Sequence, residues 1–520
     1  MYLTLDRMFD LTVQNNGKKE AIVDLTKNKR LTYEEWQVEV NQLANALRSA
    51  GVEKGDRVST LLFNSYELGT TLFACAQLGA IFNPINFRLQ PQEVEYILAD
   101  AEPKVVMFET ALEPIIASLY SKFTNISFWC INEQTPGFAV NYHERVQQAS
   151  SERINVEMTE DDDYAIMYTS GTTGRPKGVV HAHRNMMEQS IACIAHLGVS
   201  PKERGLVTAP MFHCAELHCN FIPRVHAGCT NIILHHFEPK KVLASIEQEK
   251  VTSVFAAPTM WNMLIQEDVS AYQIESLQFG TYGAAPMAPA LVTACRETLG
   301  IDLIQAYGMT EMGPAITFLA KDEQVDKAGS AGRAAFNHDI RVVRPVEDGR
   351  AEPEDVMPPG EVGEIIVRGP SMMREYYKRP DATSEVLYKG WYYSGDLGYM
   401  DEEHYLYVAD RVRDMVISGG ENIYPREVED VLHAHAGILD VAVLGEPDEV
   451  WGESVVAVVV KKDSALTEEA LDTYCKESNA LANYKRPRRY VFVEELPRNA
   501  SGKIQKFLLR EQFKQESASS

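Results

Sequence analysis

Hydrophobic positions follow two alternating patterns through most of residues 1–400. Short apolar runs such as Tyr164–Ser170 and Cys229–His235 are typical of buried strands. Between them lie stretches with apolar residues at helical spacing, such as Pro239–Lys250 and Ala288–Gly300, the second ended by its glycine. Strands that alternate with helices predict parallel sheets covered by helices.

The pattern changes near residue 340. His338–Pro345 and Gly360–Gly369 alternate polar and apolar residues, and a loop rich in proline, glycine and acid joins them. This combination predicts a small, mainly antiparallel subdomain. Beyond Tyr405–Asp414 a further segment has its own helix at Tyr424–His435, followed by strands and another helix. We therefore predict a domain boundary at Arg411–Asp414.

Length, charge and cysteine use restrict the class of protein. A chain of 520 residues exceeds what one core normally serves, so we expect at least two domains. The formal net charge of -24 argues against nonspecific binding of nucleic acid. Eight cysteines without paired spacing suit reduced thiols, and the N-terminus has no signal-peptide pattern, so we expect a cytoplasmic protein.

Two apolar stretches invite alternative interpretations. Val58–Ile85 is interrupted by Asn64, Glu67 and Asn83, and so predicts strand, helix, strand rather than a membrane span. In His213–Cys219 a metal site is the alternative, because Cys214 and His218 stand four residues apart. No second pair stands at zinc-finger spacing, so we interpret this stretch as a pocket wall or as ordinary buried contacts.

A loop rich in glycine and hydroxyl groups follows the strand at Tyr164–Ser170. It differs from a Walker loop, because Lys177 is followed by Gly178 and Pro176 offers no backbone donor. A loop of this kind can surround phosphate oxygens while Lys177 adds charge; the alternative is a solvated polar turn. Its hydroxyl and glycine positions are Thr169, Ser170, Gly171, Thr172, Thr173 and Gly174.

Four more motifs follow in order, at Ile304–Pro314, Tyr392–Asp414, Ile417–Glu429 and Leu496–Lys506. Together with the loop they resemble the adenylate-forming superfamily of acyl-CoA synthetases (AMP-binding, acyl-activating), and the pattern is nearest to fatty-acid–CoA ligases. Relatives of this superfamily include beetle luciferases and the adenylation domains of peptide synthetases.

The resemblance implies an α/β fold. A large N-terminal AMP-binding domain, residues 1–411, would hold two helix-covered mixed β-sheets and a small β subdomain at about 335–411. A small mobile α+β domain, residues 412–520, would carry the catalytic lysine.

The resemblance also implies a reaction in two halves. A carboxylate attacks the α-phosphate of ATP, which gives an acyl-adenylate and pyrophosphate; coenzyme A then displaces AMP. Because the first half joins two anions, catalysis must rest on positioning and charge neutralisation. ATP, Mg²⁺, coenzyme A and a small carboxylic acid are the implied cofactor and substrates, and Glu311 and Thr169 the implied magnesium ligands.

Further roles are carried over from the motifs. Tyr307 would stack on adenine, with Gly308 beside it in the cofactor site, and Thr310 would lie near the phosphates. Asp396 would accept hydrogen bonds from both ribose hydroxyls, and Arg411 would add charge beside the ribose and phosphates. The strand end at Gly283, Ala284 and Ala285 would line adenine and the acyl group, with His213, Tyr282 and Met309 beside the acid.

The remaining roles fall near the C-terminus. Lys503 would bridge the carboxylate and the α-phosphate, Arg413 stands at the hinge, and Gly420 would let pantetheine pass. Lys506 and the basic run Tyr484–Tyr490 are expected to be surface charges, with coenzyme A phosphates as the alternative for the run.

The acid itself is less defined by the sequence. The motifs around the acyl pocket are apolar, so a medium- or long-chain fatty acid is the first choice and an aryl acid of the benzoate or cinnamate kind the second. A luciferase-like enzyme and a carrier-loading adenylation enzyme are weaker alternatives. Peripheral contact with a membrane and a homodimer are left open.

Overall fold

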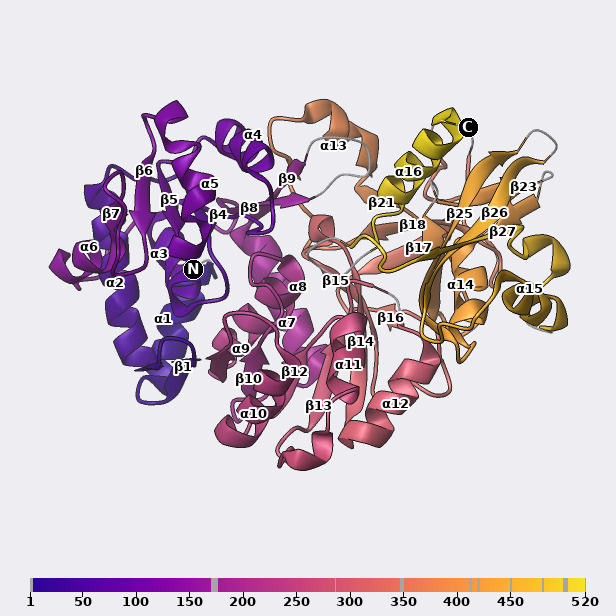
Figure 1. The fold of residues 1–520 in the computed structure, drawn as a ribbon. Coiled ribbons are helices and arrows are strands. Elements are labelled where there is room, and N and C mark those ends of the chain that lie inside the picture. Colours follow the sequence, from indigo (N-terminus) through magenta and orange to yellow (C-terminus); the bar gives the residue numbers. More distant parts are fainter. Residues whose placement is uncertain are drawn as a thin grey trace.

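The computed structural model describes residues 3–169, 176–285, 287–346, 350–411, 414–418, 421–448, 451–478, 481–498 and 504–519. Figure 1 shows the N-terminal, indigo part of the chain at one side and the C-terminal, orange to yellow part at the other, with the magenta central segments between them. Two large sheets, a small antiparallel sheet and a C-terminal sheet make up the fold.

The two large sheets are mostly parallel with antiparallel edges, as the strand–helix alternation predicts. One has nine strands, in the order β16 (Arg333–Ala334), β15 (Ala315–Leu319), β14 (Asp302–Gly308), β13 (Phe279–Tyr282), β12 (Ser253–Phe255), β10 (Arg204–Val207), β11 (Thr230–Ile233), β1 (Glu20–Asp24), β2 (Lys29–Thr32). The other has eight, in the order β19 (Glu375–Tyr376), β9 (Lys177–Ala182), β8 (Asp163–Thr169), β4 (Ile81–Pro84), β3 (Arg57–Leu61), β5 (Val105–Phe108), β6 (Ser127–Cys130), β7 (Val140–Asn141).

The two smaller sheets follow later in the chain. The first is antiparallel, as the alternating pattern predicts, and contains β17 (Asp339–Val343), β18 (Gly363–Arg368), β21 (Trp391–Met400), β20 (Leu387–Tyr388) and β22 (Leu406–Arg411). The second contains β24 (Glu421–Ile423), β23 (Val416–Ser418), β26 (Gly452–Lys461), β25 (Ile438–Asp448) and β27 (Arg489–Val493). The α/β class is therefore confirmed, whereas the boundary at residue 411 stays a prediction.

Helices cover the sheets and begin where the sequence provides caps. Thr32 and Glu35 form a reciprocal capping box at α2, and α12 is followed by Gly300 with φ 68°, which suits a residue without a β-carbon. The longer helices are α1 (Leu5–Asn16), α2 (Tyr33–Ser49), α3 (Tyr66–Leu78), α4 (Pro91–Ala101), α7 (His183–Leu197), α10 (Pro239–Glu249), α11 (Pro258–Ile265), α12 (Pro289–Leu299), α14 (Pro425–His433), α15 (Glu468–Glu477) and α16 (Lys506–Ser519). The shorter ones are α5 (Glu113–Ala117), α6 (Tyr142–Gln148), α8 (Cys214–Glu216), α9 (Ile222–His226) and α13 (Pro380–Val386).

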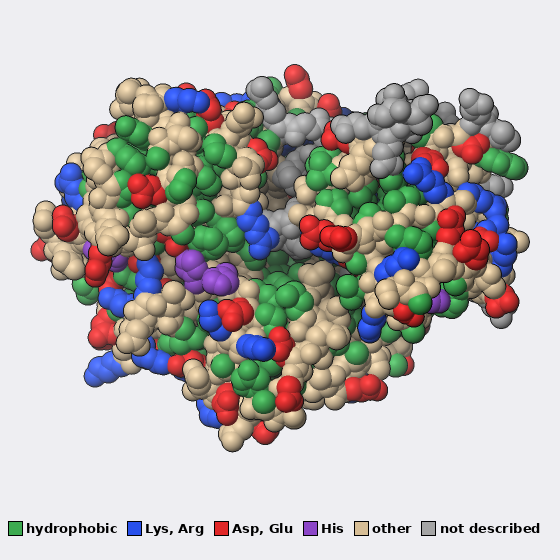
Figure 2. All heavy atoms as spheres, in the orientation of Figure 1, with side chains coloured by type: hydrophobic (Ala, Val, Ile, Leu, Met, Phe, Trp, Pro, Cys, Tyr) green, Lys and Arg blue, Asp and Glu red, His purple; other side chains and the backbone are tan. Residues whose placement is uncertain are grey.

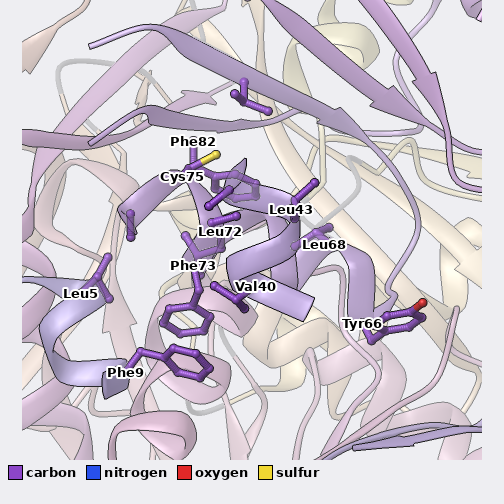
Figure 3. Packing of buried hydrophobic residues seen from close by; sticks show 14 of the residues in the cluster. Leu5, Phe9, Val40, Leu43, Tyr66, Leu68, Leu72, Phe73, Cys75 and Phe82 are labelled. Carbon is purple, nitrogen blue, oxygen red and sulfur yellow. The ribbon is translucent and has the colours of Figure 1, made fainter. Parts of the chain in front are cut away.

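The segment Val58–Ile85 forms β3, α3 and β4, as expected, and lies at the centre of the largest hydrophobic core. Every residue of α3 is buried. Figure 3 shows Leu72 and Phe73 of this helix packed toward Leu5, Phe9 and Val40 of α1 and α2. The Phe9 and Phe73 rings stack with centroids 4.5 Å apart. Burial on all sides explains why the helix is apolar without spanning a membrane.

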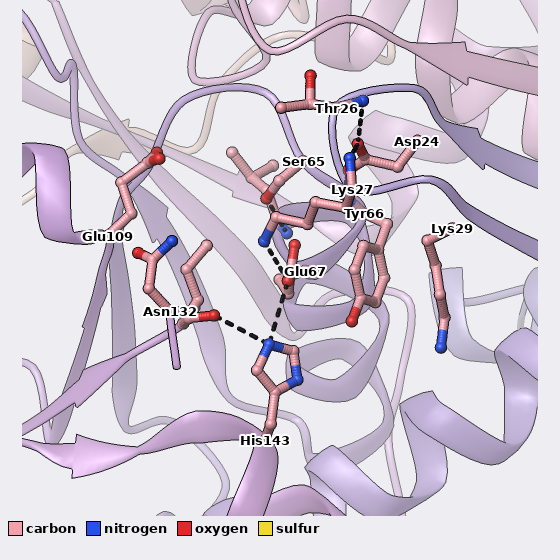
Figure 4. Close-up of polar contacts among 12 residues, drawn as sticks. Asp24, Thr26, Lys27, Lys29, Ser65, Tyr66, Glu67, Glu109, Asn132 and His143 are labelled. Carbon is pink, nitrogen blue, oxygen red and sulfur yellow. Dashed lines mark hydrogen bonds and ion pairs between the residues drawn. The ribbon is translucent and has the colours of Figure 1, made fainter. Parts of the chain in front are cut away.

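The polar residues at the start of α3 form a second cluster inside this core (Figure 4). Glu67, whose side chain is 0% exposed, pairs with Lys27 and lies 3.6 Å from Nε2 of His143. Asp24 accepts hydrogen bonds from the backbone N–H groups of Tyr66 and Lys27, at 3.1 and 3.0 Å. The cluster ties the start of α3 to the end of β1, and the contacts it makes are structural.

Candidate active site

A cavity of about 1570 Å³ opens at the carboxyl ends of β8, β13 and β14. This is the end of a parallel sheet at which α/β proteins bind ligands. In the space-filling view the face of the molecule is hollowed in its middle, and acidic and basic side chains are interspersed over it (Figure 2). The cavity brings together these expected site residues: Thr169, Lys177, His213, Tyr282, Gly283, Ala284, Tyr307, Gly308, Met309, Thr310, Glu311 and Asp396.

The remaining expected residues are not among the described residues that line the cavity. Ser170, Gly171, Thr172, Thr173, Gly174, Arg413, Gly420 and Lys503 lie outside the described residues. Thr169 and Pro176 line the cavity, as do Arg498 and Ile504. The backbone of Arg411 is paired with Asp396, and Ala285 follows the cavity residue Ala284.

In the part of the cavity where the motifs predict the nucleotide, a side-chain contact joins β14 to β21. The Tyr307 hydroxyl donates to Oδ2 of Asp396 at 2.7 Å, which fixes the carboxylate beside the ring. Gly308 follows Tyr307, and a β-carbon there would lie 1.7 Å from the Pro314 carbonyl oxygen. Only glycine therefore allows this close approach of the two backbones.

Glu311 lies in the part of the cavity where the motifs predict phosphate binding, which we call the phosphate side. Its Oε1 accepts a hydrogen bond from the Tyr376 hydroxyl at 2.7 Å, and Nζ of Lys177 lies 4.9 Å from the centroid of the Tyr376 ring. Burial, followed by the charge of Glu311, raises the pKa of Tyr376, so the phenol stays protonated and donates. A carboxylate held in this way, in a cavity that Thr169 also lines, offers the oxygen ligands that Mg²⁺ prefers.

His181 supports the neighbouring residue. Its Nε2 lies 2.7 Å from the carbonyl oxygen of Thr310, and burial lowers its pKa to about 4. The imidazole is therefore neutral at pH 7 and holds the loop before Glu311 without adding charge. The Thr310 hydroxyl in turn lies 3.2 Å from Sγ of Cys214, which connects the phosphate side to the acyl side.

We call the part of the cavity where the motifs predict the acid the acyl side. It is lined by uncharged groups on a helical stretch that runs from α8 through a π-helical turn, η3 (Leu217–Phe221), to α9. Such turns occur frequently at functional sites. Burial lowers the pKa of His213 to about 4, and its Nδ1 accepts from the Ala215 N–H at 3.2 Å. Other lining residues on this side are Cys214, Ala215, Cys219, Asn220, Phe255 and Thr281.

The same stretch contains the two residues for which a metal site was the alternative, Cys214 and His218. Nε2 of His218 is paired with the Tyr164 hydroxyl at 2.8 Å, within the core. Across the described ranges, no three His, Cys, Asp or Glu side chains lie close enough to hold an ion. Glu216, whose pKa burial raises to about 8, contacts Arg224 at 3.5 Å instead of the cavity.

Two features were missed by the sequence reasoning. Tyr376 comes from β19, 65 residues after Glu311, and nothing in its local pattern marks it as a partner of that carboxylate. Lys506 was expected at the surface, but its side chain is 13% exposed, lines the cavity and pairs with Glu429 at 2.9 Å. That prediction is wrong because α16 packs Lys506 against an acidic side chain of α14. The basic run Tyr484–Tyr490 is also paired: Lys485 with Glu427 and Arg489 with Glu446.

Two family models match successive parts of the chain. Residues 9–377 match the model of the AMP-binding enzyme family, and residues 427–503 match that of the AMP-binding enzyme C-terminal domain. The chain belongs to the AMP-binding enzyme family. It is 36% identical, over 95% of both chains, to long-chain-fatty-acid–CoA ligase FadD13 of Mycobacterium tuberculosis. It is 38% identical to a feruloyl-CoA synthase of an Amycolatopsis species, over 93% of this chain and 94% of that one.

A solved structure of similar shape is the anthranilate CoA ligase AuaEII in complex with anthranoyl-AMP. It has a TM-score of 0.92 and 26% identity, and covers 99% of this chain and 98% of its own. As a member of the AMP-binding enzyme family the chain is an AMP-forming acid–CoA ligase, with ATP, Mg²⁺ and coenzyme A as the cofactors of its class. In the described residues, no helix is long and apolar enough to cross a membrane.

Proposed function

We propose that this ligase activates an apolar carboxylic acid, with a medium- or long-chain fatty acid as the first candidate. The observation that carries the proposal is one cavity with two chemistries: Lys177 and Glu311 line its phosphate side, and uncharged residues line its acyl side. A relative named for long-chain fatty acids supports the first candidate. Eight free, buried cysteines support a cytoplasmic location.

In the first half-reaction the cationic groups bring two anions together. Lys177 would neutralise phosphate, while Glu311 and Thr169 would hold Mg²⁺, which supplies further neutralisation. Tyr307 would stack on adenine, with Asp396 and Arg411 at the ribose. Lys503 would bridge the attacking carboxylate and the α-phosphate. Loss of one well-placed donor of this kind costs about 10²–10³ in rate.

In the second half-reaction the segment after residue 412 would turn about Arg413, so that each orientation completes a different site. Gly420 would then border the path of the thiol, where a side chain would block it.

An aryl acid is the second candidate. Two buried polar side chains, Asn220 and Thr281, stand in the acyl wall, with Thr281 Oγ1 3.4 Å from Asn220 Oδ1. A bond of that length leaves both groups able to bind a polar ring substituent. A relative named for feruloyl-CoA supports this candidate.

A panel of fatty and aryl acids, assayed for release of AMP that depends on ATP and coenzyme A, tests the proposal. We expect Lys503→Ala to abolish adenylate formation yet largely spare attack of coenzyme A on supplied acyl-adenylate. We expect Gly420→Leu to do the reverse. Equal losses in both half-reactions for either variant would contradict its assigned role.

A further inference from the structure

Tyr376 touches both groups that the proposed function assigns to the phosphate side. Its hydroxyl donates to Oε1 of Glu311 at 2.7 Å, and Nζ of Lys177 lies 4.9 Å from its ring centroid. Tyr376 itself lines the cavity, although only 4% of its surface is exposed. One side chain therefore contacts the carboxylate and the ammonium group from the protein side.

The backbone fixes the place of Tyr376. Strand β19 is the edge of the eight-stranded sheet and pairs antiparallel with β9, with Tyr376 opposite Val179. On either side of this pair, the Met373 N–H donates to the Glu311 carbonyl oxygen at 2.7 Å and the Tyr377 N–H to the Gly178 carbonyl oxygen at 2.7 Å. These bonds connect β19 to the chain at Glu311 and to the chain beside Lys177.

The ring is held as firmly as the backbone. Tyr376 packs in a hydrophobic cluster with Val179, Met312 and Tyr392. Because neighbours on several sides restrict its rotamer, the hydroxyl points in one direction, and the carboxylate that accepts from it is restricted in turn.

We propose that Tyr376 is the positioning residue of the phosphate side: its hydroxyl orients Glu311 for the divalent cation, and its ring seats Lys177 for the phosphates. This inference rests on the proposed role of Glu311. A neutral donor suits the task, because it restricts one carboxylate oxygen without neutralising the charge that attracts the cation. The ring adds a cation–π contact that holds Lys177 without an acidic partner that would repel phosphate.

The test separates hydroxyl from ring by measuring binding in the full-length enzyme, with ATP and without any carboxylic acid, so that no turnover occurs. Mn²⁺ binding is followed by electron paramagnetic resonance. Tyr376→Phe removes only the hydroxyl and should weaken Mn²⁺ binding about tenfold or more, the effect typical of groups that orient metal ligands. Tyr377→Phe, at the residue that follows β19, is the matched control and should change the affinity less than twofold.

A second comparison isolates the ring. Binding of ATP without metal, measured by calorimetry, should be unchanged in Tyr376→Phe and weakened severalfold in Tyr376→Leu, because only the second variant removes the cation–π contact. Should the leucine variant fail to fold, Tyr376→Met, which retains more volume, takes its place. Equal affinities for the phenylalanine and leucine variants would overturn the role of the ring.

Glu311→Gln separates the inferred role of Tyr376 from the proposed role of Glu311. It should weaken Mn²⁺ binding by itself, and adding Tyr376→Phe to it should have no further effect, because both act through one carboxylate. If Glu311→Gln weakens binding and Tyr376→Phe does not, the inference fails and the proposed function stands. If Glu311→Gln leaves Mn²⁺ binding unchanged, the proposed role of Glu311 fails as well.

Discussion

Glu311 in the cavity and Glu67 in the core are both restrained carboxylates, but they differ in what balances their charge. Glu67 is fully buried and pairs with Lys27, with His143 3.6 Å away (Figure 4). Glu311 accepts from the neutral phenol of Tyr376. Among the described residues no Lys, Arg or His lies within ion-pair distance of it.

The difference separates a structural carboxylate from one that can act as a ligand. A buried charge is tolerated when a partner inside the protein compensates it. Lys27 is that partner for Glu67, so an external cation is not needed to balance its charge. Glu311 borders the cavity and has no such cationic partner among the described residues, so its carboxylate oxygens can bind an external divalent cation. The two roles can be separated by measuring activity and unfolding side by side.

The largest effect is expected at Glu311. Glu311→Gln keeps the shape and the hydrogen bond from Tyr376 but removes the charge, so acid-dependent exchange of pyrophosphate into ATP should fall about 10²–10³-fold. The free energy of unfolding, measured in urea, should change little because Glu311 borders the cavity and has no ion pair among the described residues that the substitution would break. A large loss of stability with little loss of exchange would show that Glu311, like Glu67, is a structural carboxylate.

The converse is expected at Lys27. Lys27→Ala leaves Glu67 buried without its cation and should reduce the free energy of unfolding by about 2–3 kcal/mol, somewhat below the cost for a fully buried pair because Lys27 keeps 24% of its side chain exposed. Turnover per folded molecule should be unchanged.

Lys29→Ala is the control for this experiment. Lys29 pairs with Glu39 at 2.6 Å, nearer the surface, and its loss should cost less than about 1 kcal/mol. Similar losses for the two lysines would show that burial of Glu67 adds nothing.

The sequence predicted the regular elements and Glu311 better than it predicted the role of Glu67. The strand at Tyr164–Ser170 and the helix at Pro239–Lys250 are confirmed as β8 and α10, because periodicity is a local property of the chain. Glu311 was assigned through its motif. Glu67 was noticed only as an interruption of an apolar run, since its partner lies 40 residues earlier and their pairing depends on the folded core.

The histidine beside the cavity loop provides a smaller test. Burial lowers the pKa of His181 from 6.5 to about 4, so the fold favours its neutral form and stability falls as the pH drops below about 6.5. Between pH 7 and pH 5 this group should cost about 2 kcal/mol.

His181→Gln can still donate to the Thr310 carbonyl oxygen and should remove that part of the pH dependence. Urea unfolding at the two pH values measures it, and the exposed His236→Gln is the control. An unchanged difference between pH 5 and pH 7 in His181→Gln would mean that the imidazole titrates normally in the folded state.

The smallest effect concerns the backbone of the two regions. Ala284 at the cavity has φ 64°, and Asn28 beside Lys27 has φ 50°. Asparagine tolerates this left-handed conformation, whereas for alanine it costs roughly 1 kcal/mol, and such strain is concentrated at functional sites.

Ala284→Gly removes the strain but makes the unfolded chain more flexible, so a net gain of at most about 0.5 kcal/mol in unfolding free energy is expected. Ala285→Gly, whose φ is not positive, should instead lose about 0.5–1 kcal/mol. If both substitutions lower the unfolding free energy equally, the backbone at Ala284 stores no strain and is as relaxed as the backbone at Asn28.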